Sequence, residues 1–222
     1  MPHTPEITAV VFDLDGLLFN TEDLYQDCGG EILGRRGHEF TPELLDKMMG
    51  RPSAVALQIM IDHCNLSATV AQLERETDEI FEGLFDTRLA PMPGAVELLD
   101  AIESIGLPKG IATSSRRTFV DNVLSRFDWA PRFQTILSAE SVTQGKPNPD
   151  IYLTAAAQLD VSPEQMMVLE DSENGCNAAV AAGAFTVAVP SGHTLRHTFE
   201  GAAIKAESLA DPRIYQTLQI DA

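Results

Sequence analysis

The chain has 222 residues, of which 44% are hydrophobic, and a formal net charge of −18, which suits one domain with an insertion or two small domains. A surface this acidic repels nucleic acid and anionic membranes, and no apolar run approaches the roughly 18 residues that cross a bilayer. Three scattered cysteines without metal-binding spacing, Cys28, Cys64 and Cys176, predict reduced thiols in a cytoplasmic protein.

The first predicted element is a strand over residues 7–13, which is rich in β-branched and apolar side chains. Two carboxylates stand at its C-terminal end in the sequence Asp13-Leu14-Asp15-Gly16, and the glycine allows a sharp turn after them. Ligands of parallel α/β sheets bind at this end of the strands. Two acids there indicate a metal site, a nucleophile or both.

Residues 20 to about 88 have the pattern of a helical block. Thr41-Pro42 predicts the start of one helix, and apolar residues at helical spacing predict an amphipathic helix over 68–86. The sequence Gly50-Arg51-Pro52-Ser53 interrupts the block, because a residue before proline avoids the helical region, and Ser53 can cap the next helix. The sequence Pro91-Met92-Pro93-Gly94 ends the block as a linker.

After about residue 94, helical segments alternate with short apolar runs. The runs are Lys109–Ala112, Thr135–Leu137, Met166–Leu169 and Phe185–Val189. This alternation predicts an α/β fold, a Rossmann-like doubly wound parallel sheet. We therefore expect a core domain of residues 1–18 and 91–222, and an inserted α-helical cap domain of residues 19–90 above the end of the first strand.

Polar clusters follow the runs Lys109–Ala112 and Met166–Leu169. Thr113-Ser114-Ser115 places hydroxyl and backbone N–H groups where a helix begins, which suits a phosphate, although taken alone simple capping of that helix is the favoured interpretation. Glu170 and Asp171 are adjacent acids, which repel unless a cation lies between them. They suit Mg²⁺ as hard oxygen ligands, or Asp171 and Ser172 cap the next helix.

A third cluster is the loop Gly145-Lys146-Pro147-Asn148-Pro149-Asp150. Its two prolines stiffen the backbone and fix the direction of Lys146, and Pro149 suits the start of a helix that runs from Asp150. A lysine held beside a strand end can pair with phosphate oxygens, although taken alone a solvated surface lysine is the simpler interpretation.

Taken together and in this order, the clusters resemble the four motifs of the haloacid dehalogenase superfamily. The motifs are Asp13-Leu14-Asp15-Gly16, Thr113, Lys146 and Glu170-Asp171. The resemblance spans essentially the whole chain, and an insertion after the first strand is similar to the subgroup of β-phosphoglucomutase and small sugar-phosphate phosphatases with a helical cap.

The resemblance implies a catalytic role for each acid. Asp13 would attack phosphorus and become an aspartyl phosphate, and Asp15 would act as general acid and base. The metal would be Mg²⁺, bound by Asp13, the backbone carbonyl of Asp15 and Asp171, with Glu170 bound directly or through water. Because Asp15 is present, the chain looks like a phosphate enzyme and not like a true dehalogenase.

The resemblance also implies how phosphate is held. Thr113, Lys146 and the backbone N–H groups of Leu14 and Ser114 would bind its oxygens. Arg51, on the Gly-Arg-Pro interruption of the insertion, is a candidate for contacting the rest of the substrate or is simply a solvated side chain. The implied partner is a small phosphorylated metabolite, with no nucleic acid and no membrane, and we expect a monomer.

Three functions are consistent with this pattern. The first is a Mg²⁺-dependent phosphatase that acts on a sugar or nucleoside phosphate. The second is a β-phosphoglucomutase-type phosphomutase, which is disfavoured because Tyr25 stands where that enzyme carries a histidine in the cap. The third is a binding module that has kept the fold, which is disfavoured because the phosphoryl-transfer residues are all present.

Overall fold

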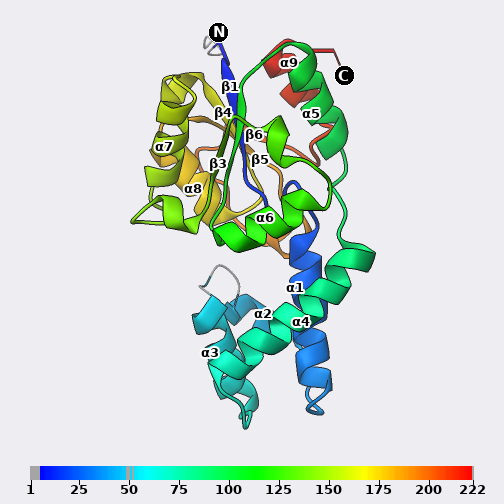
Figure 1. Ribbon diagram of the computed structural model, residues 1–222. Coiled ribbons are helices and arrows are strands. Elements are labelled where there is room, and N and C mark those ends of the chain that lie inside the picture. The colour runs from blue at the N-terminus through cyan, green and yellow to red at the C-terminus, as the bar shows by residue number, and fades with distance from the viewer. Residues whose placement is uncertain (1–5, 49–50, 52, 222) are drawn as a thin grey trace. The chain divides into compact units, whose positions relative to one another are not determined.

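The computed structural model describes residues 6–48, 51 and 53–221. These residues form two compact units. One unit combines the N-terminal segment up to Asn20 with the chain from Pro91 onward, and the other is the segment Thr21–Ala90. The ribbon in Figure 1 shows the elements of each unit.

Within the described residues, the first unit contains a six-stranded sheet in the order β3-β2-β1-β4-β5-β6, and every strand pair is parallel. The strands are β1 (Ala9–Phe12), β2 (Lys109–Ala112), β3 (Thr135–Leu137), β4 (Met166–Glu170), β5 (Phe185–Ala188) and β6 (Ile204–Lys205). The first five coincide within one or two residues with the runs that the sequence predicts. The sixth was not predicted, because two residues are too few to show a period.

Strand β1 lies in the middle of the sheet, between β2 and β4. Val11 pairs with Gly110 on one side and with Val168 on the other. All four residues of β1 are fully buried, which explains why this strand is apolar throughout and not alternating. The residues that follow β1, β2 and β4 therefore emerge side by side at one edge of the sheet.

Helices cover both faces of the sheet, as the prediction of a doubly wound fold requires. Figure 1 shows α7 and α8 on one face and α5 and α9 on the other. The helices of this unit are α5 (Ala95–Ser104), α6 (Arg117–Ser125), α7 (Asp150–Gln158), α8 (Glu173–Ala181) and α9 (Pro212–Leu218), with short 3₁₀ turns at Ala130–Arg132, Ala139–Ser141, Pro163–Gln165 and Gly192–Arg196.

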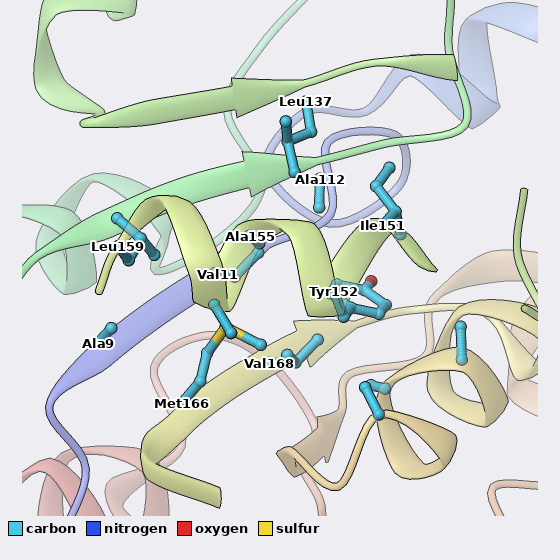
Figure 2. Packing of buried hydrophobic residues seen from close by; sticks show 14 residues of the cluster. Ala9, Val11, Ala112, Leu137, Ile151, Tyr152, Ala155, Leu159, Met166 and Val168 are labelled. Atoms are coloured by element: carbon cyan, nitrogen blue, oxygen red, sulfur yellow. The ribbon is translucent and has the colours of Figure 1, made fainter. Parts of the chain in front are cut away.

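The core under α7 and α8 consists of alternate strand residues. Figure 2 shows Ala9 and Val11 of β1 beside Met166 and Val168 of β4, with Tyr152 of α7 packed against them. Alternation sends the intervening residues of β1 to the opposite face. The same helix thus fills the core and, through Tyr152, reaches the edge where the polar clusters emerge.

The second unit is helical, as the sequence predicts. Its helices are α1 (Thr21–Gly34), α2 (Pro42–Met48), α3 (Ser53–Cys64) and α4 (Val70–Arg88). Helix α4 begins with a capping box between Thr69 and Gln72, and a paired Arg36–Glu76 contact joins the end of α1 to α4. Ser53 is the first residue of α3 and not the residue before it. In the part of the chain described, no helix has the length and apolar character needed to cross a membrane.

Candidate active site

The ends of β1, β2 and β4 bring four predicted residues together. Asp13 follows β1, Thr113 follows β2, and Glu170 and Asp171 stand at the end of β4. All four side chains are buried, with Glu170 completely inaccessible. Lys146, from the loop before α7, reaches the same place. Carboxylates so deeply buried require cations or hydrogen-bond donors.

The ammonium of Lys146 lies between two of these carboxylates. It donates to Asp13 Oδ1 at 2.5 Å, to Glu170 Oε1 at 2.6 Å and to the backbone carbonyl of Ala112 at 2.8 Å. These three bonds use all three of its N–H groups. Because the side chain is only 5% exposed, the alternative of a solvated surface lysine is wrong.

Burial and charge together set the protonation of this cluster. Burial alone would lower the pKa of Lys146, but the neighbouring carboxylates of Asp13 and Glu170 raise that pKa above its usual value. Burial raises the pKa of Asp13, Lys146 opposes this rise, and the charges of Glu170 and Asp15 add to it. The lysine therefore stays charged, and its contact is what favours the ionised form of Asp13.

Glu170 is fully occupied by donors from the protein. Its Oε1 accepts from Lys146 and from the hydroxyl of Tyr152 at 2.7 Å, and its Oε2 accepts from Ser172 N and Oγ at 3.2 and 3.0 Å. Four donors fill the lone-pair directions of a carboxylate. In this arrangement Glu170 has no direction left for a metal, so the geometry favours holding Lys146 over the direct ligation considered from the sequence.

The sequence did not point to Tyr152 or Gly175, and both lie against Glu170. Tyr152 shows only the helical spacing of a core residue. Gly175 is required because a Cβ at this position would lie 1.8 Å from Glu170 Oε1. Ser172 caps α8, its Oγ accepting from Gly175 N at 3.1 Å, so the predicted capping by Ser172 is confirmed alongside its contact to Glu170.

Asp15 is held by two hydroxyl groups from the loop after β2. Its Oδ2 accepts from Ser115 Oγ at 2.6 Å and from Thr113 Oγ1 at 3.2 Å. The residue that precedes α6 is Arg116, which makes no side-chain cap, so the alternative of simple helix capping by these hydroxyls is wrong. The sequence did not predict the contact of Ser115 with Asp15, and the predicted role of the Ser114 backbone N–H stays a prediction.

The turn after Asp15 depends on glycine, as the sequence predicts. Gly16 has a φ of 74°, a left-handed conformation that glycine adopts without strain. The carbonyl of Gly16 accepts from Ser191 Oγ at 3.3 Å, and the preceding Leu14 is buried. The segment Asp13–Gly16 is thus held in place by the buried Leu14 side chain and by the hydrogen bond from Ser191.

A divalent cation fits the donor set of this edge. None of the three Lys146 N–H groups is directed to Asp171, whose buried carboxylate adds negative charge beside Asp13 and Glu170. Among the described residues, no group of three or more His, Cys, Asp or Glu side chains is placed to hold a metal unaided. Mg²⁺ needs no such cage, because it keeps several waters and binds through one or two carboxylates and a substrate phosphate.

Arg51 lies in the other unit, where it is exposed. Its predicted contact with substrate stays a prediction. Met49, Gly50 and Pro52, its neighbours in the same predicted interruption, lie outside the described residues.

Comparisons with known proteins agree with this geometry. Residues 10–189 match the model of a family described as haloacid dehalogenase-like hydrolase. The chain is 31% identical, over 79% of its length and 81% of the relative, to a phosphorylated carbohydrates phosphatase of Thermotoga maritima. It is 32% identical to a validoxylamine A 7′-phosphate phosphatase of Streptomyces hygroscopicus subsp. limoneus, over 83% of this chain and 86% of that one.

Among solved structures, the chain is similar to CbbY from Rhodobacter sphaeroides in complex with phosphate. The TM-score is 0.80 at 28% identity, and the match covers 92% of this chain and 95% of that one.

Proposed function

The chain belongs to the haloacid dehalogenase-like hydrolases, and we propose that it is a Mg²⁺-dependent phosphatase of a small phosphorylated metabolite that works through an aspartyl-phosphate intermediate. One observation carries this proposal. A buried lysine holds Asp13 at the end of the central strand, while two hydroxyls hold Asp15 two residues later. A nucleophile needs an ionised and fixed carboxylate, and an acid–base group needs a fixed direction.

The residues divide the reaction between them. Asp13 attacks phosphorus, forming an O–P bond to its carboxylate while the bond from phosphorus to the leaving oxygen breaks. Asp15 gives its proton to that leaving oxygen, and it then takes a proton from the water that attacks the aspartyl phosphate. The second attack returns Asp13 and releases inorganic phosphate.

Charge on the transferring group needs compensation throughout, because phosphoryl transfer is mainly positioning and electrostatic stabilisation. The ammonium of Lys146 is already at Asp13 and can shift one of its bonds to a phosphate oxygen. Thr113 and the backbone N–H groups of Leu14 and Ser114 are the further predicted donors. The Thr113 hydroxyl donates to Asp15 in this structure, so to bind phosphate it would replace this hydrogen bond with one to a phosphate oxygen.

The proposed metal ligands are Asp13, Asp171 and the backbone carbonyl of Asp15. When bound, Mg²⁺ supplies positive charge that neutralises the phosphate and orients it for attack. Glu170 is left out of this set because its oxygens are engaged by Lys146, Tyr152 and Ser172.

Sugar or nucleoside phosphates are the proposed substrates, and we assign their discrimination to the inserted unit, with Arg51 as its candidate contact. The Thermotoga relative acts on phosphorylated carbohydrates, which supports the sugar class. Hydrolysis is favoured over the mutase reaction. Tyr25, at the position of the mutase histidine, packs its ring on Phe81 with centroids 4.6 Å apart and supplies no imidazole.

The test is phosphate release from p-nitrophenyl phosphate and from a panel of sugar phosphates and nucleoside monophosphates, with Mg²⁺ and with EDTA. Asp13→Asn should lower turnover by more than about 10³-fold, the scale on which loss of a nucleophile acts. Asp160→Asn is the matched control, since Asp160 is exposed and its positive φ also suits asparagine. Acid-quenched wild-type protein should carry the mass of one phosphoryl group.

Several outcomes would contradict the proposal. Unchanged turnover in Asp13→Asn, or turnover that is insensitive to EDTA, would exclude the mechanism. Conversion of a hexose 1-phosphate to its 6-phosphate with a bisphosphate primer would favour the phosphomutase. A protein that is inert on the whole panel would favour the binding module.

A further inference from the structure

A buried chain of hydrogen bonds extends from α7 to the predicted nucleophile. The hydroxyl of Tyr152 donates to Glu170 Oε1, the same oxygen accepts from Lys146, and Lys146 donates to Asp13. Tyr152 and Glu170 are fully buried. Figure 2 shows the Tyr152 ring within the apolar cluster under α7.

We propose that Tyr152 is a positioning residue for phosphoryl transfer, whose hydroxyl holds Glu170 so that the ammonium of Lys146 is shared with Asp13. The proposal rests on the proposed function for its catalytic consequence, because it concerns the lysine of the same site. Tyr152 touches no reacting atom and acts only through Glu170 and Lys146.

Packing alone does not require this hydroxyl. The ring fills its place in the core as a phenylalanine ring would, whereas a buried hydroxyl is disfavoured unless it has a partner. Here the partner is a carboxylate at 2.7 Å. Burial raises the pKa of Tyr152, so the phenol stays protonated and can only donate this bond.

The second donor on Oε1 controls how strongly Glu170 attracts Lys146. With the tyrosine present, the charge on Oε1 is compensated by two donors. Without it, Lys146 is the only side-chain donor left on that oxygen among the residues that the structure describes. The less compensated carboxylate then attracts the ammonium more strongly. The ammonium then moves toward Glu170 and away from Asp13 and the phosphate it must stabilise.

Glu170 cannot relieve this change by turning away. Its Oε2 is held by the N and Oγ of Ser172, and the α8 backbone at Gly175 approaches so closely that even a Cβ would overlap the carboxylate. The position of the Lys146 ammonium therefore depends on the donors that share Glu170 Oε1 with it.

The experiment compares Tyr152→Phe with the matched control Tyr215→Phe, a buried tyrosine on α9 in the same unit. Phenylalanine keeps the ring, over which the Lys146 ammonium lies at 5.1 Å from the centroid, so only the hydroxyl is removed. We expect kcat to fall roughly tenfold, the scale of one hydrogen bond to a charged group, with KM little changed. Tyr215→Phe should retain the wild-type kcat.

A second readout does not depend on catalysis. The sequence contains four lysines, Lys47, Lys109, Lys146 and Lys205, so the side-chain ammonium of Lys146 can be followed by NMR of ¹⁵N-lysine-labelled, metal-free protein and assigned with Lys146→Arg. Its signal should shift in Tyr152→Phe and stay in place in Tyr215→Phe.

The two readouts separate the two proposals. An unshifted ammonium signal in Tyr152→Phe overturns the positioning role, as does a wild-type kcat in that variant. If the wild-type protein releases no phosphate from any substrate, the proposed function fails, and the ammonium signal still decides whether Tyr152 positions Lys146.

Discussion

Replacement of Lys146 by methionine tests the energetics of the buried charge cluster. The substitution keeps an unbranched side chain and removes the cation that lies 2.5 Å from Asp13 and 2.6 Å from Glu170, whose side chains are 9% and 0% exposed. Removing one partner of a buried ion pair costs about 3–5 kcal/mol, because the remaining charge has no counter-ion. Since two carboxylates lose the same partner here, we expect a loss of about 4 kcal/mol or more in the free energy of unfolding.

The loss should depend on pH in a defined direction. Without the ammonium that opposes the effect of burial, the pKa of Asp13 rises further in the folded variant, which then binds a proton that the unfolded chain does not bind near neutrality. Unfolding free energy therefore falls as the pH rises. The difference from wild type should be largest at about pH 8 and should shrink toward about pH 5. Adding Asp13→Asn to Lys146→Met should recover part of the loss, because one buried charge is gone.

The assay is urea unfolding in metal-free buffer, followed by far-ultraviolet circular dichroism at both pH values. Lys47→Met is the matched control. The Lys47 ammonium lies 2.6 Å from Glu43 Oε1, but these side chains are 47% and 72% exposed, so the loss of this solvent-screened pair should leave the free energy of unfolding nearly unchanged. Equal costs for the two substitutions, or a cost for Lys146→Met that is no smaller at pH 5 than at pH 8, would refute the argument that burial makes this cluster strong.

Two further predictions concern Ser115 and Glu103. Ser115→Ala removes the shorter of the two hydroxyl contacts to Asp15 and should lower kcat roughly three- to tenfold; steady-state kinetics that match those of the exposed control Ser125→Ala would contradict this role. The hydrogen bond from Arg132, helped by Lys109, lowers the pKa of Glu103 to about 2 from 4.5, so this group stabilises the fold above its unfolded pKa and the stabilisation is lost as the pH falls from 4.5 toward 2. Because Glu103 is 39% exposed, Glu103→Gln should cost only about 1 kcal/mol near neutral pH after solvent screening, and a difference in thermal unfolding that persisted unchanged in acid would count against the ion pair.

The fold could be predicted from the sequence where local pattern and tertiary packing agree. The runs Lys109–Ala112 and Thr135–Leu137 are strands with the predicted bounds, because strands buried on both faces are apolar throughout and are bounded by turn residues. The helix predicted over 68–86 runs from Val70 to Arg88, since the Thr69 cap, not the apolar spacing, determines its start.

The sequence predicted which residues gather at the candidate site, but it did not predict which hydrogen bonds and ion pairs they make with one another. The order of the motifs places Asp13, Thr113 and Glu170 at strand ends, which parallel pairing brings to one edge, and places Lys146 on the loop before α7. Which donor each carboxylate accepts depends on side-chain directions that packing sets. Sequence alone therefore could not choose Ser115 over Ser114, nor distinguish a metal ligand from a lysine-holding group at Glu170.

Tyr152 and Gly175 escaped prediction for a related reason. At a core position of a helix, a tyrosine and a phenylalanine fit the same apolar spacing, so the sequence does not show whether the hydroxyl makes a hydrogen bond. The need for glycine at residue 175 arises from a carboxylate that approaches from another element, and this is a long-range constraint that no local pattern shows.

The central place of β1 has a consequence for the order in which the molecule can be assembled during synthesis. Val11 can pair with Gly110 and Val168 only after these later residues have been synthesised. The segment Thr21–Ala90, in contrast, is contiguous in the sequence and is synthesised before either of them. A nascent chain that ends before β4 therefore carries Asp13 without the neighbouring strand that would bury it. The proposed activity therefore depends on residues that are made late in translation, and a chain interrupted before β4 lacks two of the acids that it needs.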